Sequence, residues 1–203
     1  FKSFHLVQAS YIATKKIKQA EKTDWIKKAK SHTEFDKIQH VLIIPNYQER
    51  LEKLHETIEN LTNQTISLKK LHIVLAMEER EKEGKEKATK IIKKYEGVFG
   101  SIFATYHPDL PGEVKGKSSN EAFAGRVAYQ KLFVERHFDL DFSTVTSIDA
   151  DAIFDKQYFA YLSYNFLTDP RRYNKFWQSA VVFYNNIWKV PSGTRIISFF
   201  GSL

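Results

Sequence analysis

Four short apolar or β-branched runs, separated by helix-length segments, constrain the fold of this chain most strongly. They are Val41–Ile44, Leu71–Leu75, Ser101–Tyr106 and Thr144–Ile148. A continuous apolar run such as the first is typical of a strand buried on both faces of a parallel sheet. Because parallel neighbours need long crossover connections, the pattern predicts an α/β fold: a three-layer α/β/α domain with a mainly parallel sheet.

The segments between these runs have the apolar periodicity of amphipathic helices. In the third of these segments Ser118, Ser119 or Asn120 is expected to cap the helix at its amino end. After the fourth run we expect another helix, a turn at Asp169-Pro170 and a further strand. The expected helices are Leu51–Leu61, Glu78–Lys94, a segment with an inward stripe from Phe123 to Leu132, and Gln157–Asn165, and the further strand is Phe176–Phe183.

Composition narrows the class of protein. Apolar residues make up 42% of the 203 positions, which excludes a disordered chain, and the absence of cysteine excludes disulfides and thiolate metal sites. The net charge of +7 arises largely from the first forty residues and from a lysine-rich helix in which Glu and Lys alternate. We therefore predict a basic helical arm at 1–37 and a separate domain at 38–203, with no nucleic-acid partner.

The basic arm has two interpretations. It is either a packing arm or a juxtamembrane helix that follows a membrane span outside this sequence. The chain starts at Phe1 and ends in the apolar segment Phe199–Leu203. From these ends we expect a fragment of a longer protein, associated with the cytoplasmic side of a membrane.

Two aspartates follow the fourth run directly, as Asp149-Ala150-Asp151. If the strand continues, residues two apart point the same way, and both carboxylates face one side. Hard oxygen ligands suit Mg²⁺ or Mn²⁺, and open α/β sheets bind ligands at the carboxyl ends of their strands. The upstream pair Asp139 and Asp141 precedes the strand, so we interpret it as a solvated turn and place the metal at Asp149 and Asp151.

Side chains suited to a nucleotide follow the other three strands. An aromatic ring can stack on a base, carboxylates can accept hydrogen bonds from base or ribose, and a lysine can neutralise phosphate. Among the histidines, His40 and His72 flank strands and are expected to be structural, whereas His107 falls in a candidate active-site loop. The predicted nucleotide-binding residues are Pro45, Tyr47 and Glu49, then Glu78 and Glu79, then Lys117 and Asn120, together with Asp149.

Four segments in order carry a family resemblance: IIPNYQER, GKSSN, SIDADAIF and WQSAVVFYNN, between Gln39 and Asn186. In these segments the chain resembles the inverting glycosyltransferases of family two, which have a GT-A fold, near processive membrane-linked members such as cellulose and hyaluronan synthases. The resemblance implies that 38–203 is a nucleotide-sugar-binding GT-A domain, incomplete at its C-terminus. It also implies transfer of a sugar from a UDP- or GDP-sugar with Mg²⁺ or Mn²⁺. The implied acceptor is a polysaccharide or a lipid-linked glycan.

Two departures from that family qualify what the resemblance implies. Glu78 or Glu79 stands where the family has a base-reading aspartate. The family's catalytic carboxylate lies further along the chain, and residues 171–203 contain no Asp or Glu. The catalytic base is therefore unknown and expected downstream of Leu203, and we predict donor binding without transfer.

Two other function classes use the same features. A nucleotidyltransferase applies the same metal chemistry, but it normally carries a Gly-rich basic loop after the first strand, and PNYQER lacks one. A non-enzymatic module that binds polyanions or a membrane surface would use only the basic residues.

Overall fold

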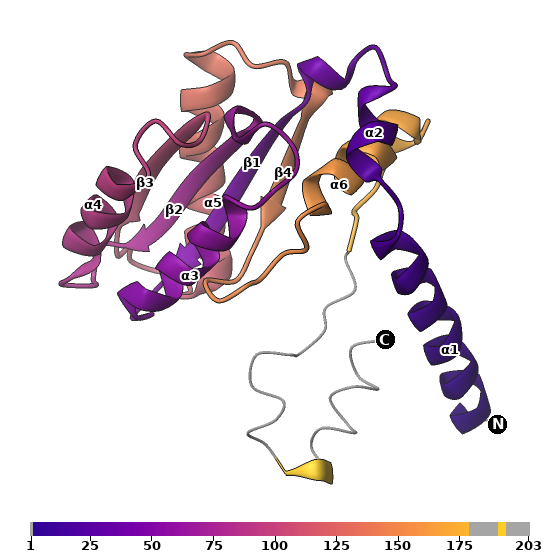
Figure 1. The fold of residues 1–203 in the computed structure, drawn as a ribbon. Coiled ribbons are helices and arrows are strands. Elements are labelled where there is room, and N and C mark those ends of the chain that lie inside the picture. The colour runs from indigo at the N-terminus through magenta and orange to yellow at the C-terminus, as the bar shows by residue number, and fades with distance from the viewer. Residues whose placement is uncertain (1, 179–190, 194–203) are drawn as a thin grey trace. The chain divides into compact units, whose positions relative to one another are not determined.

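The computed structural model describes residues 2–178 and 191–193. Its centre is a sheet of four parallel strands in the order β3-β2-β1-β4 (Figure 1). The strands are β1 (Gln39–Asn46), β2 (Leu71–Glu78), β3 (Ser101–His107) and β4 (Ser143–Ser147). All four coincide with predicted apolar runs, and all pairings are parallel, so the α/β class and its parallel sheet are confirmed.

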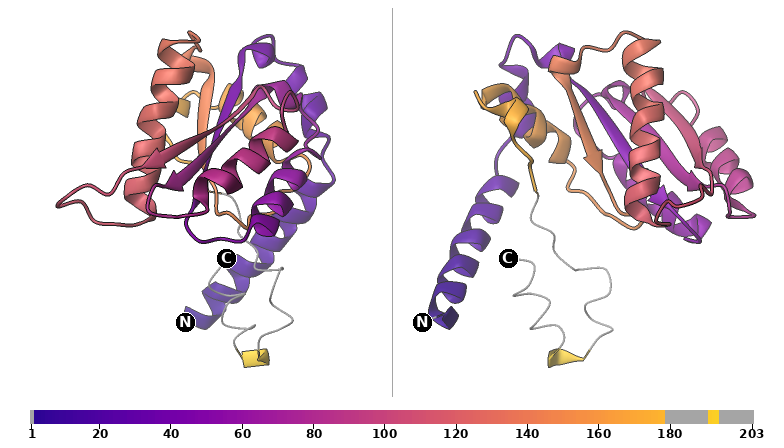
Figure 2. Two further views of the ribbon diagram at one scale, coloured as in Figure 1. Left: turned by 90° about the vertical axis from the view of Figure 1, so that its left-hand side faces the viewer. Right: turned by 180° about the vertical axis from the view of Figure 1, so that it is seen from behind.

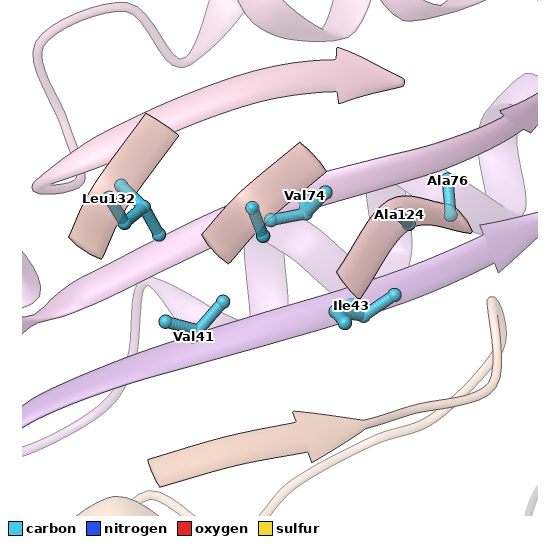
Figure 3. Close-up of a cluster of buried hydrophobic side chains, with 7 residues drawn as sticks. Val41, Ile43, Val74, Ala76, Ala124 and Leu132 are labelled. Atoms are coloured by element: carbon cyan, nitrogen blue, oxygen red, sulfur yellow. The ribbon is translucent and has the colours of Figure 1, made fainter. Parts of the chain in front are cut away.

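Helices cover both faces of the sheet. Helix α5 (Lys117–Ala128) lies on one face, and α3 (Leu51–Leu61) lies on the opposite face, as the views from front and back show (Figures 1 and 2). Alternate side chains of a strand point to opposite faces, and Val41 and Ile43 of β1 therefore pack against α5 (Figure 3). The cluster on that face also contains Val74, Ala76, Ala124, Ala128 and Leu132.

On the opposite face the apolar stripe of α3 is buried. Leu54, Ile58 and Leu61 are at most 1% exposed, and each such side chain stabilises the fold by about 1.5–3 kcal/mol relative to an exposed position. Helix α4 (Gly84–Lys94) packs against α3, and α6 (Tyr158–Thr168) packs against α2 (Trp25–Lys30). The arrangement is compatible with the predicted three-layer fold.

The remaining elements are short, apart from the first. Helix α5 continues into a π-helical turn at Tyr129–Val134. Helix α2 packs against α6, where Trp25 contacts the ring of Tyr161 and its backbone N–H donates to Gln157. The other elements are α1 (Lys2–Glu21), α2 (Trp25–Lys30) and the 3₁₀ turns Phe35–Lys37, Leu68–Lys70, Leu140–Phe142 and Arg172–Asn174.

The chain divides into two compact units, of which the sheet unit spans Trp25–Arg172. The first 24 residues, with α1, belong to the other unit, whereas the sequence placed a division after residue 37. Among the residues that the structure describes, no helix combines the length and the apolar character needed to cross a membrane.

Several predicted boundaries differ from those in the structure, including the expected helix Gln157–Asn165, which is α6 at Tyr158–Thr168. The lysine-rich helix begins at Gly84 instead of Glu78, because Glu78 still pairs with His107 as the last residue of β2. Helix α5 begins at Lys117, so the three proposed caps lie inside it, and no side chain caps it. The strand expected from Phe176 has no regular structure at 176–178, and its remainder lies outside the described residues.

Candidate functional site

A pocket of about 270 Å³ opens at the carboxyl ends of the strands. Of the predicted site residues, only Glu79 lies outside its lining; its exposed side chain follows the last residue of β2. The predicted residues that line the pocket are Pro45, Tyr47, Glu49, Glu78, Lys117, Asn120, Asp149 and Asp151. Four lining residues were not predicted: Asn46, Arg80, Gly116 and Ala150.

One end of the pocket is built from charged side chains that are already paired. Glu78 is 5% exposed, and its Oε2 lies 3.4 Å from Arg80 Nε and 3.4 Å from His107 Nδ1. The guanidinium of Arg80 in turn lies 4.0 Å from the ring centroid of Tyr47, a cation–π contact. Both side chains remain partly exposed beside the buried carboxylate of Glu78.

His107 does not lie in a loop, contrary to the sequence expectation. It is the last residue of β3 and is buried between two carboxylates, since its Nε2 lies 3.0 Å from Glu113 Oε2 and its Nδ1 faces Glu78. Glu113 belongs to the loop at 108–116, which leads to Gly116 and Lys117. The contact therefore ties this loop to the ends of β2 and β3.

The other end of the pocket carries an exposed ion pair. Lys117 Nζ lies 2.5 Å from Asp149 Oδ1 and 3.7 Å from Glu121 Oε1. The hydrogen bond with Asp149 is the main cause that raises the pKa of Lys117 above its usual value. Lys117 is therefore held as a cation beside the aspartates.

Asp149 and Asp151 do not continue a strand, so the geometric reason first given for their common direction was wrong. Strand β4 ends at Ser147, and the N–H of Ala152 closes a turn on the carbonyl of Asp149. Both carboxylates are exposed and line the same pocket. A turn brings them together instead of a strand.

The donor set fits a hard divalent cation that is shared with a ligand. Within residues 2–178 and 191–193, no cluster of three or more His, Cys, Asp or Glu side chains is placed to hold a metal ion. Mg²⁺ usually takes one or two carboxylates and completes its shell with water and substrate phosphates. Asp149 and Asp151 meet that requirement, whereas they do not make a protein-only cage.

The net charge of the pocket also favours a cation that is shared with a ligand. Four carboxylates in the pocket lining, on Glu49, Glu78, Asp149 and Asp151, oppose the two cations of Arg80 and Lys117 and leave a net charge of −2. A diphosphate carries several negative charges of its own. Such an anion is expected to enter this pocket only together with a cation.

Two buried amide oxygens in the pocket lack a hydrogen-bond partner, namely Oδ1 of Asn46 and Oδ1 of Asn120. Their orientation is fixed, because Nδ2 of Asn46 donates to Glu81 at 3.1 Å and Nδ2 of Asn120 donates to the carbonyl of Ala76 at 2.7 Å. Buried polar atoms are normally paired. These two acceptors are therefore unsatisfied, and each belongs to a side chain that lines the pocket.

The upstream pair, Asp139 and Asp141, lies outside the pocket. Both side chains are exposed, and the carboxylate of Asp139 accepts a hydrogen bond from the N–H of Asp141 at 2.9 Å. The pair forms part of the 3₁₀ turn that precedes β4. The position of this pair agrees with its interpretation as a solvated turn.

Sequence reasoning missed Asn46 and Arg80 for different reasons. Asn46 is the last residue of β1 and was included in the first loop without a role. Arg80 follows β2 by two residues, as Asp149 follows β4 by two, so its position relative to the strand end could have revealed it. Comparison of the chain with protein-family models and with curated proteins finds no match.

Proposed function

We propose that this chain binds a nucleotide-diphospho-sugar at the carboxyl edge of its sheet, together with Mg²⁺ or Mn²⁺. In this proposal it is the donor-binding part of an inverting glycosyltransferase with a GT-A fold. The observation that carries the proposal is the composition of one pocket, in which an aromatic stack and a buried carboxylate lie with a lysine and two aspartates. Each group corresponds to one part of a nucleoside diphosphate.

The paired end of the pocket is assigned to the nucleoside. The base would stack on the surface formed by Tyr47 and Arg80, and Glu78 would accept a hydrogen bond from the base or the ribose. The unpaired oxygens of Asn46 and Asn120 add acceptors beside it. Phosphates offer no donors at neutral pH, whereas ribose hydroxyls and base N–H groups do, so these acceptors favour the nucleoside.

The exposed end is assigned to the diphosphate. Asp149 and Asp151 would hold the divalent cation, which when bound would stabilise the charge that develops on the leaving diphosphate. Lys117 would transfer its contact from Asp149 to a phosphate oxygen, a distance that its flexible side chain can span. No pocket residue is assigned as the catalytic base, which the family resemblance places in a further part of the protein.

Titration calorimetry tests this function against the polyanion-binding alternative. With Mn²⁺ present, UDP or GDP is expected to bind, and heparin is expected to compete only weakly. Binding of heparin alone would favour a polyanion-binding module instead. Asp139→Asn is the matched control, since it removes an exposed carboxylate from an Asp-x-Asp pair that lies outside the pocket.

A further inference from the structure

A polar face of α3 and the turn after it hold the backbone that carries the two aspartates. Thr57 Oγ1 donates to the carbonyl of Ala150 at 2.8 Å. Asn60 makes two bonds with Phe154, donating to its carbonyl at 3.2 Å and accepting from its N–H at 2.7 Å. Further along, Gln64 donates to the carbonyl of Asp155 at 2.8 Å.

Thr57 and Asn60 share one side of α3, because residues three apart lie on one helical face. Gln64 follows the end of the helix at Leu61 by three residues. The apolar stripe beside them, with Leu54 and Ile58, is buried against the sheet. The polar face is thus carried by a helix whose own position is fixed by the core.

The backbone that they hold has little regular structure of its own. Residues 148–157 form neither helix nor strand. Buried carbonyl and N–H groups need partners, and in this segment side chains of α3 supply partners that a neighbouring strand would otherwise provide. Thr57 is fully buried, and Ala150, whose carbonyl it binds, lies between Asp149 and Asp151.

We propose that Thr57 and Asn60 are positioning residues of the metal site, which fix the turn so that both carboxylates face the pocket. This role rests on the proposed function. The hydrogen bond from Thr57 holds the carbonyl of Ala150, which lies between the two aspartates. The two hydrogen bonds with Asn60 hold the backbone of Phe154, three residues after Asp151. Together they fix the turn on both sides of Asp151.

The reason that such support matters is the geometry of the cation. Mg²⁺ requires near-octahedral coordination at about 2.0–2.1 Å, so a small displacement of one carboxylate removes it as a ligand. Loss of groups that orient metal ligands typically costs about 10–100-fold in metal affinity. We expect an effect of that size from the loss of the Thr57 hydroxyl.

The test compares Thr57→Val with Thr57→Ser. Valine keeps the shape of the side chain and removes the hydroxyl, whereas serine keeps the hydroxyl. We expect Thr57→Val to weaken Mn²⁺-dependent UDP binding by about 10–100-fold and to leave uridine binding unchanged, and Thr57→Ser to restore UDP binding. The electron paramagnetic resonance spectrum of bound Mn²⁺, which reports its coordination, should change in the valine variant only.

The outcomes separate this proposal from the function on which it rests. If wild-type chain binds no UDP with Mn²⁺, both are overturned. If wild type and Thr57→Val bind UDP equally, or if uridine binding falls as much as UDP binding, only the positioning role is overturned. Should Thr57→Val fail to fold, Asn60→Ala gives the same comparison at a half-buried position, and its unchanged Mn²⁺-dependent UDP binding would equally overturn the role.

Discussion

The two edges of the sheet differ in how completely their buried polar side chains are paired. At the amino edge, His40 is fully buried and both ring nitrogens have partners, Thr144 at 2.7 Å and Ser163 at 2.9 Å. At the carboxyl edge, Asn46 and Asn120 are equally buried but retain an unpaired oxygen each. Both ring nitrogens of His40 are used within the fold, whereas the two unpaired amide oxygens belong to side chains that line the pocket.

Charge differs between the edges in the same sense. Burial lowers the pKa of His40 to about 3 and that of His72 to about 4, so both are neutral near pH 7. The pocket at the other edge carries the net charge of −2 described above. Changes at the amino edge should therefore alter stability, and changes at the carboxyl edge should alter binding.

The largest expected effect is the pH dependence of stability at the amino edge. A histidine whose pKa is lowered by folding stabilises the native state above its unfolded pKa of about 6.5 and loses that contribution as pH falls. With folded values of about 3 for His40 and about 4 for His72, the unfolded state binds nearly two more protons at pH 5. Near pH 5 the free energy of unfolding should therefore fall by roughly 2–3 kcal/mol for each unit by which the pH is lowered.

Urea denaturation at pH values from about 4.5 to about 6.5 measures that slope, because this range lies between the folded and the unfolded pKa values of the two histidines. In His40→Gln about half of the slope should remain, contributed by His72. A slope unaffected by this substitution would show that His40 is not neutral and buried in the folded chain. UDP binding at pH 7 should be the same in His40→Gln and wild type.

Next in size is the effect of the aspartates at the carboxyl edge. Asp149→Asn or Asp151→Asn should reduce Mn²⁺-dependent UDP binding by about 100-fold or more, since a direct ligand is lost instead of a supporting group. Thermal stability should hardly change because both side chains are exposed. Asp141→Asn is the matched control. If UDP binding were weakened by Asp141→Asn and not by the other two variants, the metal site would lie at the upstream pair.

Substitution of Lys117 should have a smaller effect, which weakens the binding of UDP and strengthens the binding of Mn²⁺ alone. Lys117→Met should weaken UDP binding by about tenfold through loss of a charge-assisted contact. The same variant should bind Mn²⁺ alone up to about fivefold more tightly, because an exposed ion pair contributes at most about 1 kcal/mol and Asp149 is released from it. Lys115→Met, which breaks the exposed pair with Asp109 outside the pocket, is the control.

The smallest expected effect comes from the unpaired amide oxygens. Asn46→Leu should weaken UDP and uridine to the same extent, by about threefold to tenfold for one hydrogen bond, and leave Mn²⁺-pyrophosphate binding unchanged. Thr105→Val is the control, since the buried hydroxyl of Thr105 also lacks a partner but lies outside the pocket lining. Equal weakening of pyrophosphate binding would place Asn46 at the diphosphate instead.

Much of the fold could be predicted because strands buried on both faces leave continuous apolar runs such as Val41–Ile44. The candidate site was placed by the rule that ligands bind at the carboxyl ends of parallel strands. Choosing Glu78 over Glu79 needed the structure, because the end of β2 is set by its pairing with β3 at His107. Since Glu78 and Glu79 are the same residue type, the sequence does not show which of them ends the strand.

The polar face of α3 could not be predicted from the sequence. Thr57 and Asn60 are neutral polar residues on an amphipathic helix, and in a sequence such residues are typical of a solvent-facing side. Their partners are backbone groups about 93 and 94 residues away along the chain. Backbone acceptors have no residue identity, so no pattern in the sequence points to them.

One measurement tests the central claim most directly, namely that Mn²⁺ and UDP bind jointly at Asp149 and Asp151. The amplitude of the free Mn²⁺ paramagnetic resonance signal is followed as wild-type chain is added with and without UDP. We predict a large loss of the free signal only when chain and UDP are present together, and no such loss for Asp151→Asn. A loss that is the same without UDP, or that survives Asp151→Asn, would contradict the claim.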